Sequence, residues 1–213
     1  MSYLVNLKIG GRPVLVVGAG AVALRKVEGL LEAGASVTVV APRTCAGIER
    51  LAAQGSVTLH RRPYAGGDCA GAFLVMAATG DEEANARVAR DADALGILVN
   101  VADRPALCTA TLPAVVRRGS LTLAVATEGK CPAFAHALRE ELQERYGAQF
   151  GIALDLMGEL RARMISQRWE SPRIQAALEG IYRDGLPAAV GRADRGELLA
   201  LLRRHLGPEF PLD

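Results

Sequence analysis

Residues 14–42 restrict the fold of this chain more than any other stretch. The apolar run 14–17 leads into the turn Gly18-Ala19-Gly20. Residues 21–33 then repeat apolar side chains at helical spacing, and residues 36–40 form a β-branched run that ends near a proline. This order of strand, glycine turn, helix and strand predicts a βαβ unit.

The glycine turn indicates a binding site for a pyrophosphate group. A strand that enters a helix through Gly-x-Gly directs backbone N–H groups and the positive end of the helix dipole to one point. Gly18 permits the tight turn, Gly20 lets a phosphate approach the backbone, and Ala23 fills the third small position. Inside a complete βαβ unit this pattern favours dinucleotide binding over the alternative, a tight turn without a ligand.

The second strand lacks the acidic residue that usually contacts the ribose of a dinucleotide. Such a carboxylate is expected roughly 20 residues after the first glycine, but the stretch Thr38-Val39-Val40-Ala41-Pro42-Arg43 contains none. Arg43 would suit a 2′-phosphate, and backbone groups near Ala41 and Pro42 would suit the ribose. The residues alone therefore leave NAD and NADP open.

Composition excludes several classes of protein. The 213 residues are 50% hydrophobic and carry a formal net charge of +2, which allows one good core and a smaller second one. No basic run is interleaved with aromatics, so a nucleic-acid partner is not expected. Because neither a signal-peptide pattern nor a run of about 18 apolar residues is present, we expect a cytoplasmic protein without a membrane partner.

Cysteine and histidine spacing gives no signal for a disulfide framework or a metal site. The three histidines are isolated in the sequence. The four cysteines form no C-x-x-C pair and are expected to be reduced thiols: Cys45, Cys69, Cys108 and Cys131.

Three further apolar runs complete the prediction of an α/β fold with a Rossmann-like, doubly wound parallel sheet. They cover residues 57–60, 73–78 and 97–101 and alternate with helical segments. The expected N-caps of the helices after the second and fourth strands are Thr44 and Asp81.

Polar residues follow two of these strands at the edge where ligands bind in such sheets. Thr79 and Asp81 follow one strand, and Asp103 follows the last. Capping is the preferred interpretation of Asp81, and turn initiation is the simplest one for Asp103. We assign residues 1–110 to this dinucleotide-binding domain.

Residues 111–147 break the alternating pattern. Two strand-like runs, 111–116 and 121–126, flank the turn 117–120, and Pro132 suits the first turn of an amphipathic helix. These elements have no sheet of their own to complete. We therefore interpret them as a small α+β segment that pairs with a second copy, which predicts a homodimer.

Residues 148–213 show helical patterns only. Helices are expected over 149–168, 172–183 and 194–205, which together form a small helical C-terminal domain. The arginines of this domain are interpreted as solvated side chains, with a lid over an anionic substrate as the alternative. They include Arg161, Arg163, Arg168 and Arg173.

Six motifs, in order along the chain, resemble the precorrin-2 dehydrogenase family, which includes free-standing dehydrogenases and the N-terminal part of siroheme synthase. They are VGAGAVALRK, GASVTVVAP, AATGDEEAN, NVAD, LPAVVRRGSLTLAVAT and GKCPAFAHALREEL. The resemblance implies NAD-dependent oxidation of precorrin-2 to sirohydrochlorin, a tetrapyrrole, in siroheme biosynthesis. It also implies a homodimer with a Rossmann domain, a central dimerisation segment and a helical tail.

The resemblance implies roles for individual residues. Asp103, the aspartate of the NVAD motif, is the implied catalytic residue. Because the missing acidic residue is ordinary in this family, we expect NAD as the cofactor. The implied cofactor contacts, with the glycine turn and the end of the fourth strand added, are Gly18, Gly20, Ala21, Val22, Pro42, Arg43 and Thr79.

The chemistry of the residues agrees with these roles. Oxidation of a reduced tetrapyrrole moves a hydride to the nicotinamide and a proton to a base, and a carboxylate at the sheet edge can accept that proton. Glu128 and Cys131 depart from the family pattern, which often has glycine and serine there. The candidate substrate-binding residues are Asn100, Arg117, Arg118, Thr127 and Lys130.

Other functions are compatible with the sequence. Some members of the family also insert ferrous iron into sirohydrochlorin, so a bifunctional enzyme is one alternative. An NAD(H)-sensing regulatory module, which needs no base at the sheet edge, is an alternative of another class. A short-chain alcohol dehydrogenase is disfavoured because no tyrosine has a lysine four residues later.

Overall fold

The computed structural model describes residues 3–212 and divides the chain into two compact units, Met1–Leu112 and Pro113–Asp213. The first unit has hydrophobic cores on both faces of its sheet, and the second has a core between its helices. Within residues 3–212, no helix has the length and apolar character needed to cross a membrane.

The first unit is built on one parallel sheet. Its strand order is β3-β2-β1-β4-β5, so the chain reverses direction across the sheet between β1 and β4. The strands are β1 (Pro13–Val17), β2 (Ser36–Val40), β3 (Val57–His60), β4 (Leu74–Ala77) and β5 (Leu98–Val101). The helices are α1 (Ala21–Glu32), α2 (Ala46–Ala53) and α3 (Glu82–Ala94), and the 3₁₀ turn η1 covers Pro105–Leu107. The predicted α/β fold with a parallel sheet is confirmed.

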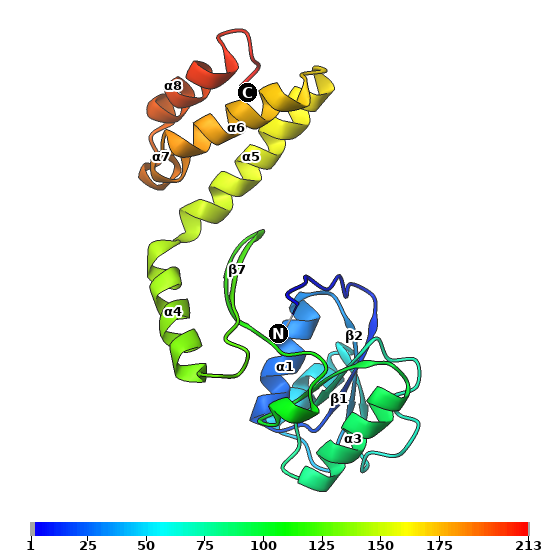
Figure 1. The fold of residues 1–213 in the computed structure, drawn as a ribbon. Coiled ribbons are helices and arrows are strands. Elements are labelled where there is room, and N and C mark those ends of the chain that lie inside the picture. Colours follow the sequence, from blue (N-terminus) through cyan, green and yellow to red (C-terminus); the bar gives the residue numbers. More distant parts are fainter. Residues whose placement is uncertain (1–2, 213) are drawn as a thin grey trace. The chain divides into compact units, whose positions relative to one another are not determined.

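Helices cover both faces of this sheet because the strands alternate apolar side chains to either side. Val14 and Val16 pack with α1 and α2 on one face, whereas Leu15 and Val17 pack with α3 on the other. Figure 1 shows α1 and α3 on opposite sides of the sheet. β1 is therefore buried on both sides, and the end of β1 is fixed at the centre of the sheet.

Two local predictions in this unit need correction, and one is confirmed. Cys45, not Thr44, is the N-cap of α2, because the Thr44 hydroxyl donates a hydrogen bond to the Glu49 carboxylate. Residues 61–73, between β3 and β4, form turns without an α-helix. Asp81 caps α3 as predicted, since its carboxylate accepts hydrogen bonds from two backbone N–H groups of the first turn.

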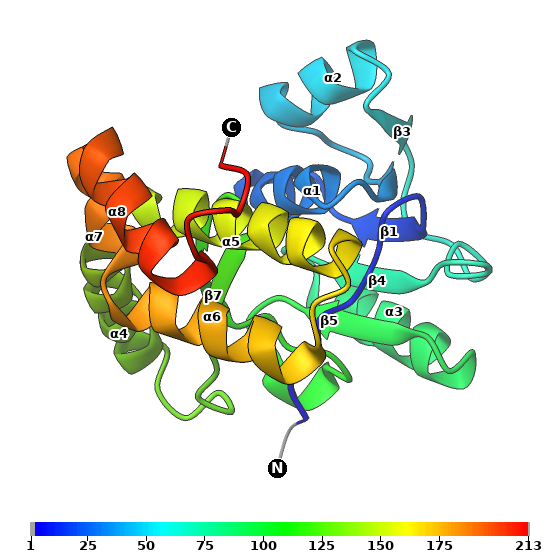
Figure 2. The ribbon, with the colours of Figure 1, turned by 90° about the horizontal axis from the view of Figure 1, so that it is seen from above.

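Within residues 113–212, the second unit consists of one antiparallel hairpin and five helices. Figure 2 labels these helices α4 to α8. β6 (Ala114–Arg118) pairs with β7 (Leu121–Val125). The helices are α4 (Pro132–Arg145), α5 (Ala148–Ser166), α6 (Ser171–Arg183), α7 (Leu186–Arg192) and α8 (Arg195–Leu206).

Two features of this unit differ from the sequence prediction. Arg117 and Arg118 lie in β6 rather than in the turn, opposite Thr122 and Leu121. The short helix α7 was not predicted, although Pro187 in its first turn is a typical helix-start signal.

Helix α5 approaches the hairpin closely at one residue. A Cβ on buried Gly151 would lie 2.2 Å from the carbonyl oxygen of Arg118, so the helix can pack here only without a side chain. Gly158 lies further along the same helix, and a Cβ there would have no neighbouring atom within 4 Å. The packing of α5 therefore excludes a side chain at Gly151 but leaves room for one at Gly158.

We expect Gly151→Ala to lower the melting temperature, because the methyl group collides with backbone that cannot move aside cheaply. Gly158→Ala is the matched control and should stabilise the protein by about 0.5–1 kcal/mol, the usual gain from alanine over glycine in a helix. Thermal unfolding followed by circular dichroism measures both. Equal effects of the two substitutions would contradict the close packing of α5 on β6.

Candidate functional site

The glycine turn after β1 is locked against the end of β4. Gly18 has φ +109°, and a Cβ there would lie 2.3 Å from the carbonyl oxygen of Ala78. The Gly18 N–H donates to the carbonyl oxygen of Val40 at 2.9 Å, which also ties the turn to β2. The ends of three neighbouring strands thus meet at one point, the expected place of a ligand in this fold.

The N-terminus of α1 has the properties of an anion site. Its N-cap, Gly20, supplies no side-chain hydrogen bond, and the first turn contains no acidic residue. A Cβ on Gly20 would meet no atom within 4 Å, so the approach to the first N–H groups is open. Ala21 and Val22 are exposed beside it. These residues fit a pyrophosphate, which needs free N–H donors and no side chain in its way.

The loop after β2 is held next to the glycine turn. The backbone N–H of Cys45 donates to the carbonyl oxygen of Ala19 at 2.9 Å. Pro42 and Arg43, which precede Cys45, are exposed. The structure therefore brings the predicted cofactor residues Pro42 and Arg43 to the same edge of the sheet as the glycine turn.

Thr79 is held in place by a buried asparagine that the sequence analysis missed. Asn85 on α3 is 5% exposed. Its amide nitrogen donates to the Thr79 carbonyl oxygen at 3.0 Å, and its amide oxygen accepts from the Thr79 backbone N–H at 3.2 Å. The hydrogen bonds of Asn85 thus fix the loop that the Gly18 turn contacts.

Asp103 lies two residues beyond β5 and is exposed. Its φ is +57°, the left-handed conformation that aspartate and asparagine adopt more readily than most residues. The adjacent Arg104 pairs with the Glu82 carboxylate on α3. A carboxylate at this position is open to a substrate while its backbone is held in a turn.

Asn100, a predicted substrate-binding residue, is 7% exposed, and its side chain is engaged inside the protein. Its amide nitrogen donates to the Ala110 carbonyl oxygen at 2.9 Å, and its amide oxygen accepts from the Lys26 ammonium at 2.8 Å. Lys26 was missed in the sequence analysis. Its spacing in the sequence indicated that it lies on the buried face of α1. Lys26 is three residues after Ala23 and four before Leu30, and both are buried.

The other predicted substrate-binding residues belong to the second unit. Arg118 donates to the carbonyl oxygens of Tyr146 and Gln143, at 2.8 and 2.9 Å, so its guanidinium caps the end of α4. Thr127 and Lys130 lie in the turn before α4, where the Lys130 N–H donates to the Thr127 carbonyl oxygen at 3.0 Å. Arg117 and Lys130 are exposed. Arg118 is therefore occupied by the fold.

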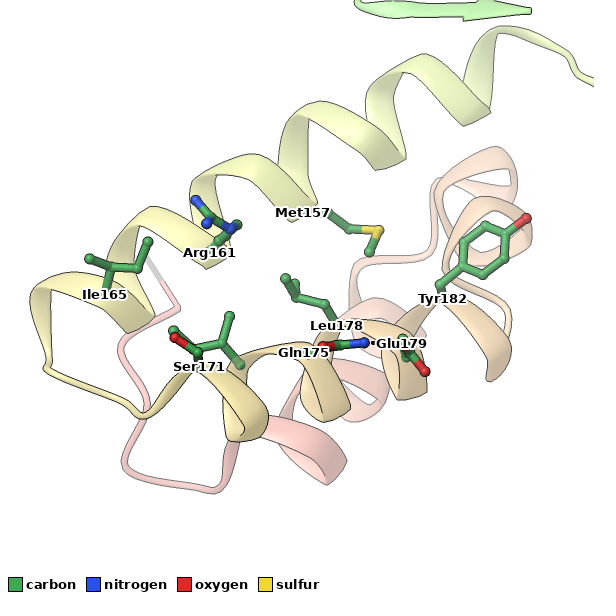
Figure 3. A pocket seen from close by; sticks show the side chains of 9 residues that line it. Met157, Arg161, Ile165, Ser171, Gln175, Leu178, Glu179 and Tyr182 are labelled. Carbon is green, nitrogen blue, oxygen red and sulfur yellow. Dashed lines mark hydrogen bonds between the residues drawn. The ribbon is translucent and has the colours of Figure 1, made fainter.

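A cavity of about 540 Å³ lies between α5 and α6 (Figure 3). Arg161 and Glu179 are the charged residues of its lining, and Gln175 donates to the Glu179 carboxylate at 2.9 Å. Two other arginines of this domain have structural contacts: Arg163 donates to the Pro211 carbonyl oxygen at 3.0 Å, and Arg173 stacks on Trp169. This groove carries little net charge.

Metal-binding side chains are not clustered in the described part of the chain. Within residues 3–212, no group of three or more histidine, cysteine, aspartate or glutamate side chains is placed to hold a metal ion.

Comparison with known proteins identifies relatives for nearly the whole chain. Residues 5–114 match the family described as "Putative NAD(P)-binding". Siroheme synthase of Ectopseudomonas mendocina is 38% identical over 194 residues, which cover 90% of this chain and 42% of that protein. Siroheme synthase of Pseudoalteromonas translucida is 39% identical over 171 residues, 80% of this chain and 36% of that protein. The chain thus spans about two fifths of the length of such relatives.

A solved structure agrees with these relatives. SirC, described as a precorrin-2 dehydrogenase, has a TM-score of 0.78 and 28% sequence identity, and the match covers 96% of this chain and 98% of SirC. The matches support the prediction of an NAD-binding Rossmann domain and confirm the family resemblance.

We expect Gly20→Ala to fold normally but to bind NAD about tenfold or more weakly, because the methyl group occupies the open approach to α1; tenfold equals about 1.4 kcal/mol. Gly18→Ala should instead lower the melting temperature, since its methyl group collides with Ala78. Gly29→Ala, on the same helix with no atom within 4 Å of the added Cβ, is the control; it should keep the NAD affinity and should not lower the melting temperature. Calorimetric titration with NAD and thermal unfolding separate the outcomes, and unchanged NAD affinity of Gly20→Ala would contradict the site.

Proposed function

Because the chain belongs to the precorrin-2 dehydrogenase and siroheme synthase family, we propose that it catalyses the NAD-dependent oxidation of precorrin-2 to sirohydrochlorin. One observation carries the proposal more than any other. The uncapped N-terminus of α1 and the exposed carboxylate of Asp103 follow strands of the same parallel sheet at its carboxyl edge.

The reaction removes two hydrogen atoms from the substrate, one as a hydride and one as a proton. NAD, held at the first turn of α1, would supply the hydride acceptor. In this proposal Asp103 accepts the proton at a carboxylate oxygen, while the turn between β5 and η1 holds the group in place. Positioned proton transfer of this kind contributes typically about 100- to 10,000-fold to the rate.

In this proposal, three loops at the edge of the sheet bind NAD. The first turn of α1, with Gly20, Ala21 and Val22, binds the pyrophosphate through backbone N–H groups. Pro42 and Arg43 face the adenosine side after β2. Thr79, held by Asn85, borders the path from the glycine turn toward β5.

The substrate proposal rests on charge. Precorrin-2 carries several carboxylates, and exposed cations attract them. Arg117, Thr127 and Lys130 are the proposed contacts in the second unit. Arg118 is left out because the α4 carbonyl oxygens already use its guanidinium, and Asn100 acts from inside the protein rather than as a direct contact.

Self-association is the proposed role of the central segment. Among residues 3–212, β6 and β7 pair with no further strand, so the hairpin has open strand edges to which another strand could add. Phe134 in the first turn of α4 is 61% exposed, an apolar surface that a second copy would cover. We therefore propose that the protein forms a homodimer. The cytoplasmic location expected from the sequence stays a prediction.

Iron insertion into sirohydrochlorin is a second candidate activity. It requires loss of two pyrrole N–H protons, and the exposed carboxylate of Asp103 is placed to accept a proton. The assay supplies sirohydrochlorin and ferrous iron without NAD and follows siroheme formation. This iron-insertion assay is independent of the dehydrogenase assay.

We expect Asp103→Asn to lower kcat for precorrin-2 oxidation by about 100-fold or more. Asparagine tolerates the same left-handed backbone and is nearly the same size, so the loss reports the missing base rather than a changed turn. Anaerobic assays follow NADH and the tetrapyrrole spectrum together.

Asp81→Asn is the matched control, because Asp81 caps α3 at the same sheet edge and asparagine caps equally well. Its kcat should stay close to wild type. Full turnover of Asp103→Asn would remove Asp103 from the catalytic role. Measurable NAD binding without any turnover of wild-type protein would favour the NAD(H)-sensing module.

We expect sedimentation equilibrium to give twice the 22.4 kDa chain mass. Phe134→Glu should weaken the dimer, because a charge would be buried where the apolar ring is covered. Leu95→Glu, at an exposed position of the first unit, is the control and should leave the dimer intact. A monomer at every concentration would rule out the proposal.

A further inference from the structure

The end of β2 is the place where a sheet of this kind distinguishes NAD from NADP. The adenosine ribose lies there, and an acidic residue binds the 2′-hydroxyl of NAD whereas an arginine accommodates the 2′-phosphate of NADP. In this chain β2 is followed by Ala41, Pro42 and Arg43. Residues 41–53 contain one acidic residue, Glu49 on α2. The cofactor preference therefore depends on the charges of this loop and of α2.

The guanidinium of Arg43 is available to a ligand. Arg43 is exposed, and within residues 3–212 its side chain has no hydrogen bond or ion pair. The backbone N–H of Cys45, two residues later, donates to the Ala19 carbonyl oxygen at 2.9 Å. The loop that carries this cation is thus tied through its backbone to the glycine turn, where the pyrophosphate is proposed to bind.

Glu49 does not replace the missing carboxylate, because two neighbours already use it. The Thr44 hydroxyl donates to one carboxylate oxygen, and the Arg61 guanidinium donates to both oxygens, at 2.5 and 3.3 Å. These hydrogen bonds, with that from Arg61 the larger cause, hold the pKa of Glu49 below its usual value. The carboxylate is therefore ionised, and its charge is balanced by a guanidinium rather than left to bond a ribose hydroxyl.

Arg61 adds a second positive charge to this edge of the sheet. The parallel register pairs Val40 of β2 with His60 of β3, so Arg61 leaves the sheet next to the loop that carries Arg43. Its contact with Glu49 ties it to α2. The edge beyond β2 and β3 is thus basic, with one carboxylate that is already paired.

The N-terminus of α2 supplies backbone donors beside Arg43. Its N-cap, Cys45, makes no side-chain hydrogen bond to the first turn. Residues 46–48, which begin the helix, carry no charge. The first N–H groups of a helix have no partner within the helix and favour an anion. Because Arg43 precedes the N-cap by two residues, a free cation and free N–H donors lie together at the end of β2.

We propose that Arg43 and the N-terminus of α2 bind the 2′-phosphate of NADP, so that this site takes NADP(H) as well as NAD. A guanidinium matches the geometry of phosphate oxygens, and backbone N–H groups complete the contact. The inference rests on the dinucleotide site of the proposed function and deepens it, because it names a second cofactor for the same site. A site restricted to NAD typically carries a carboxylate there, which would repel the phosphate.

Calorimetric titration of the wild-type protein with NAD and with NADP tests the inference without turnover. NADP should bind at least as tightly as NAD. Added salt should weaken the binding of NADP more than that of NAD, because the additional contact is between exposed charges. Weaker binding of NADP than of NAD at low salt would overturn the proposal.

Substitution of Arg43 tests which residue carries the preference. Arg43→Ala should raise the ratio of the NADP to the NAD dissociation constant by about tenfold or more, because the charged contact with the phosphate is lost. Arg43→Glu should raise it further, since a carboxylate repels the phosphate. Arg50→Ala, which removes an exposed arginine near the end of α2, is the matched control and should leave the ratio unchanged. Thermal unfolding verifies that each variant is folded, and an unchanged ratio in Arg43→Ala would refute the assignment.

Failure of the proposed function gives a different pattern. The titrations need no precorrin-2, so NADP binding that depends on Arg43, without any precorrin-2 oxidation, would refute the proposed function and keep this inference. Precorrin-2 oxidation with NAD, together with weaker binding of NADP, would keep the function and overturn this inference. Absence of binding for both dinucleotides would overturn both.

Discussion

The contact between Gly18 and the carbonyl oxygen of Ala78 is the constraint on which the first unit depends. It brings the end of β1 against the end of β4, where the chain crosses from one half of the sheet to the other. A side chain of any size would separate these strand ends and with them the loops that follow. The same turn leads into α1, whose N-cap Gly20 leaves the approach to the first N–H groups open, so the turn that joins the strand ends also forms the anion site.

Elements with a strong hydrophobic period were predicted well. The five strands of the first unit were predicted to within one or two residues, because their apolar runs are short, continuous and bounded by glycine or proline. The glycine turn and the Asp81 N-cap could likewise be predicted from the sequence, since each depends on residues that are neighbours in sequence. The family comparisons support the same domain.

Features that depend on distant partners were not predictable. Thr44 has the chemistry of an N-cap, but its hydroxyl bonds Glu49, and Cys45 takes the cap position. Arg118 carries a positive charge suited to a carboxylate ligand, yet the end of α4 uses it. The sequence cannot show which of two satisfactory partners a polar side chain meets, because that depends on how the elements pack.

Two asparagines, Asn85 and Asn100, are the buried polar residues recorded in the described chain, and both lie at the ligand edge. Burying an amide costs free energy unless its donors and acceptors are paired, and each of these amides is paired with loop backbone. Such pairing fixes loops that have no strand-to-strand backbone hydrogen bonds of their own. The edge is thereby held rigid from inside while Asp103 stays exposed, an arrangement that suits a site where only the reacting group must meet the substrate.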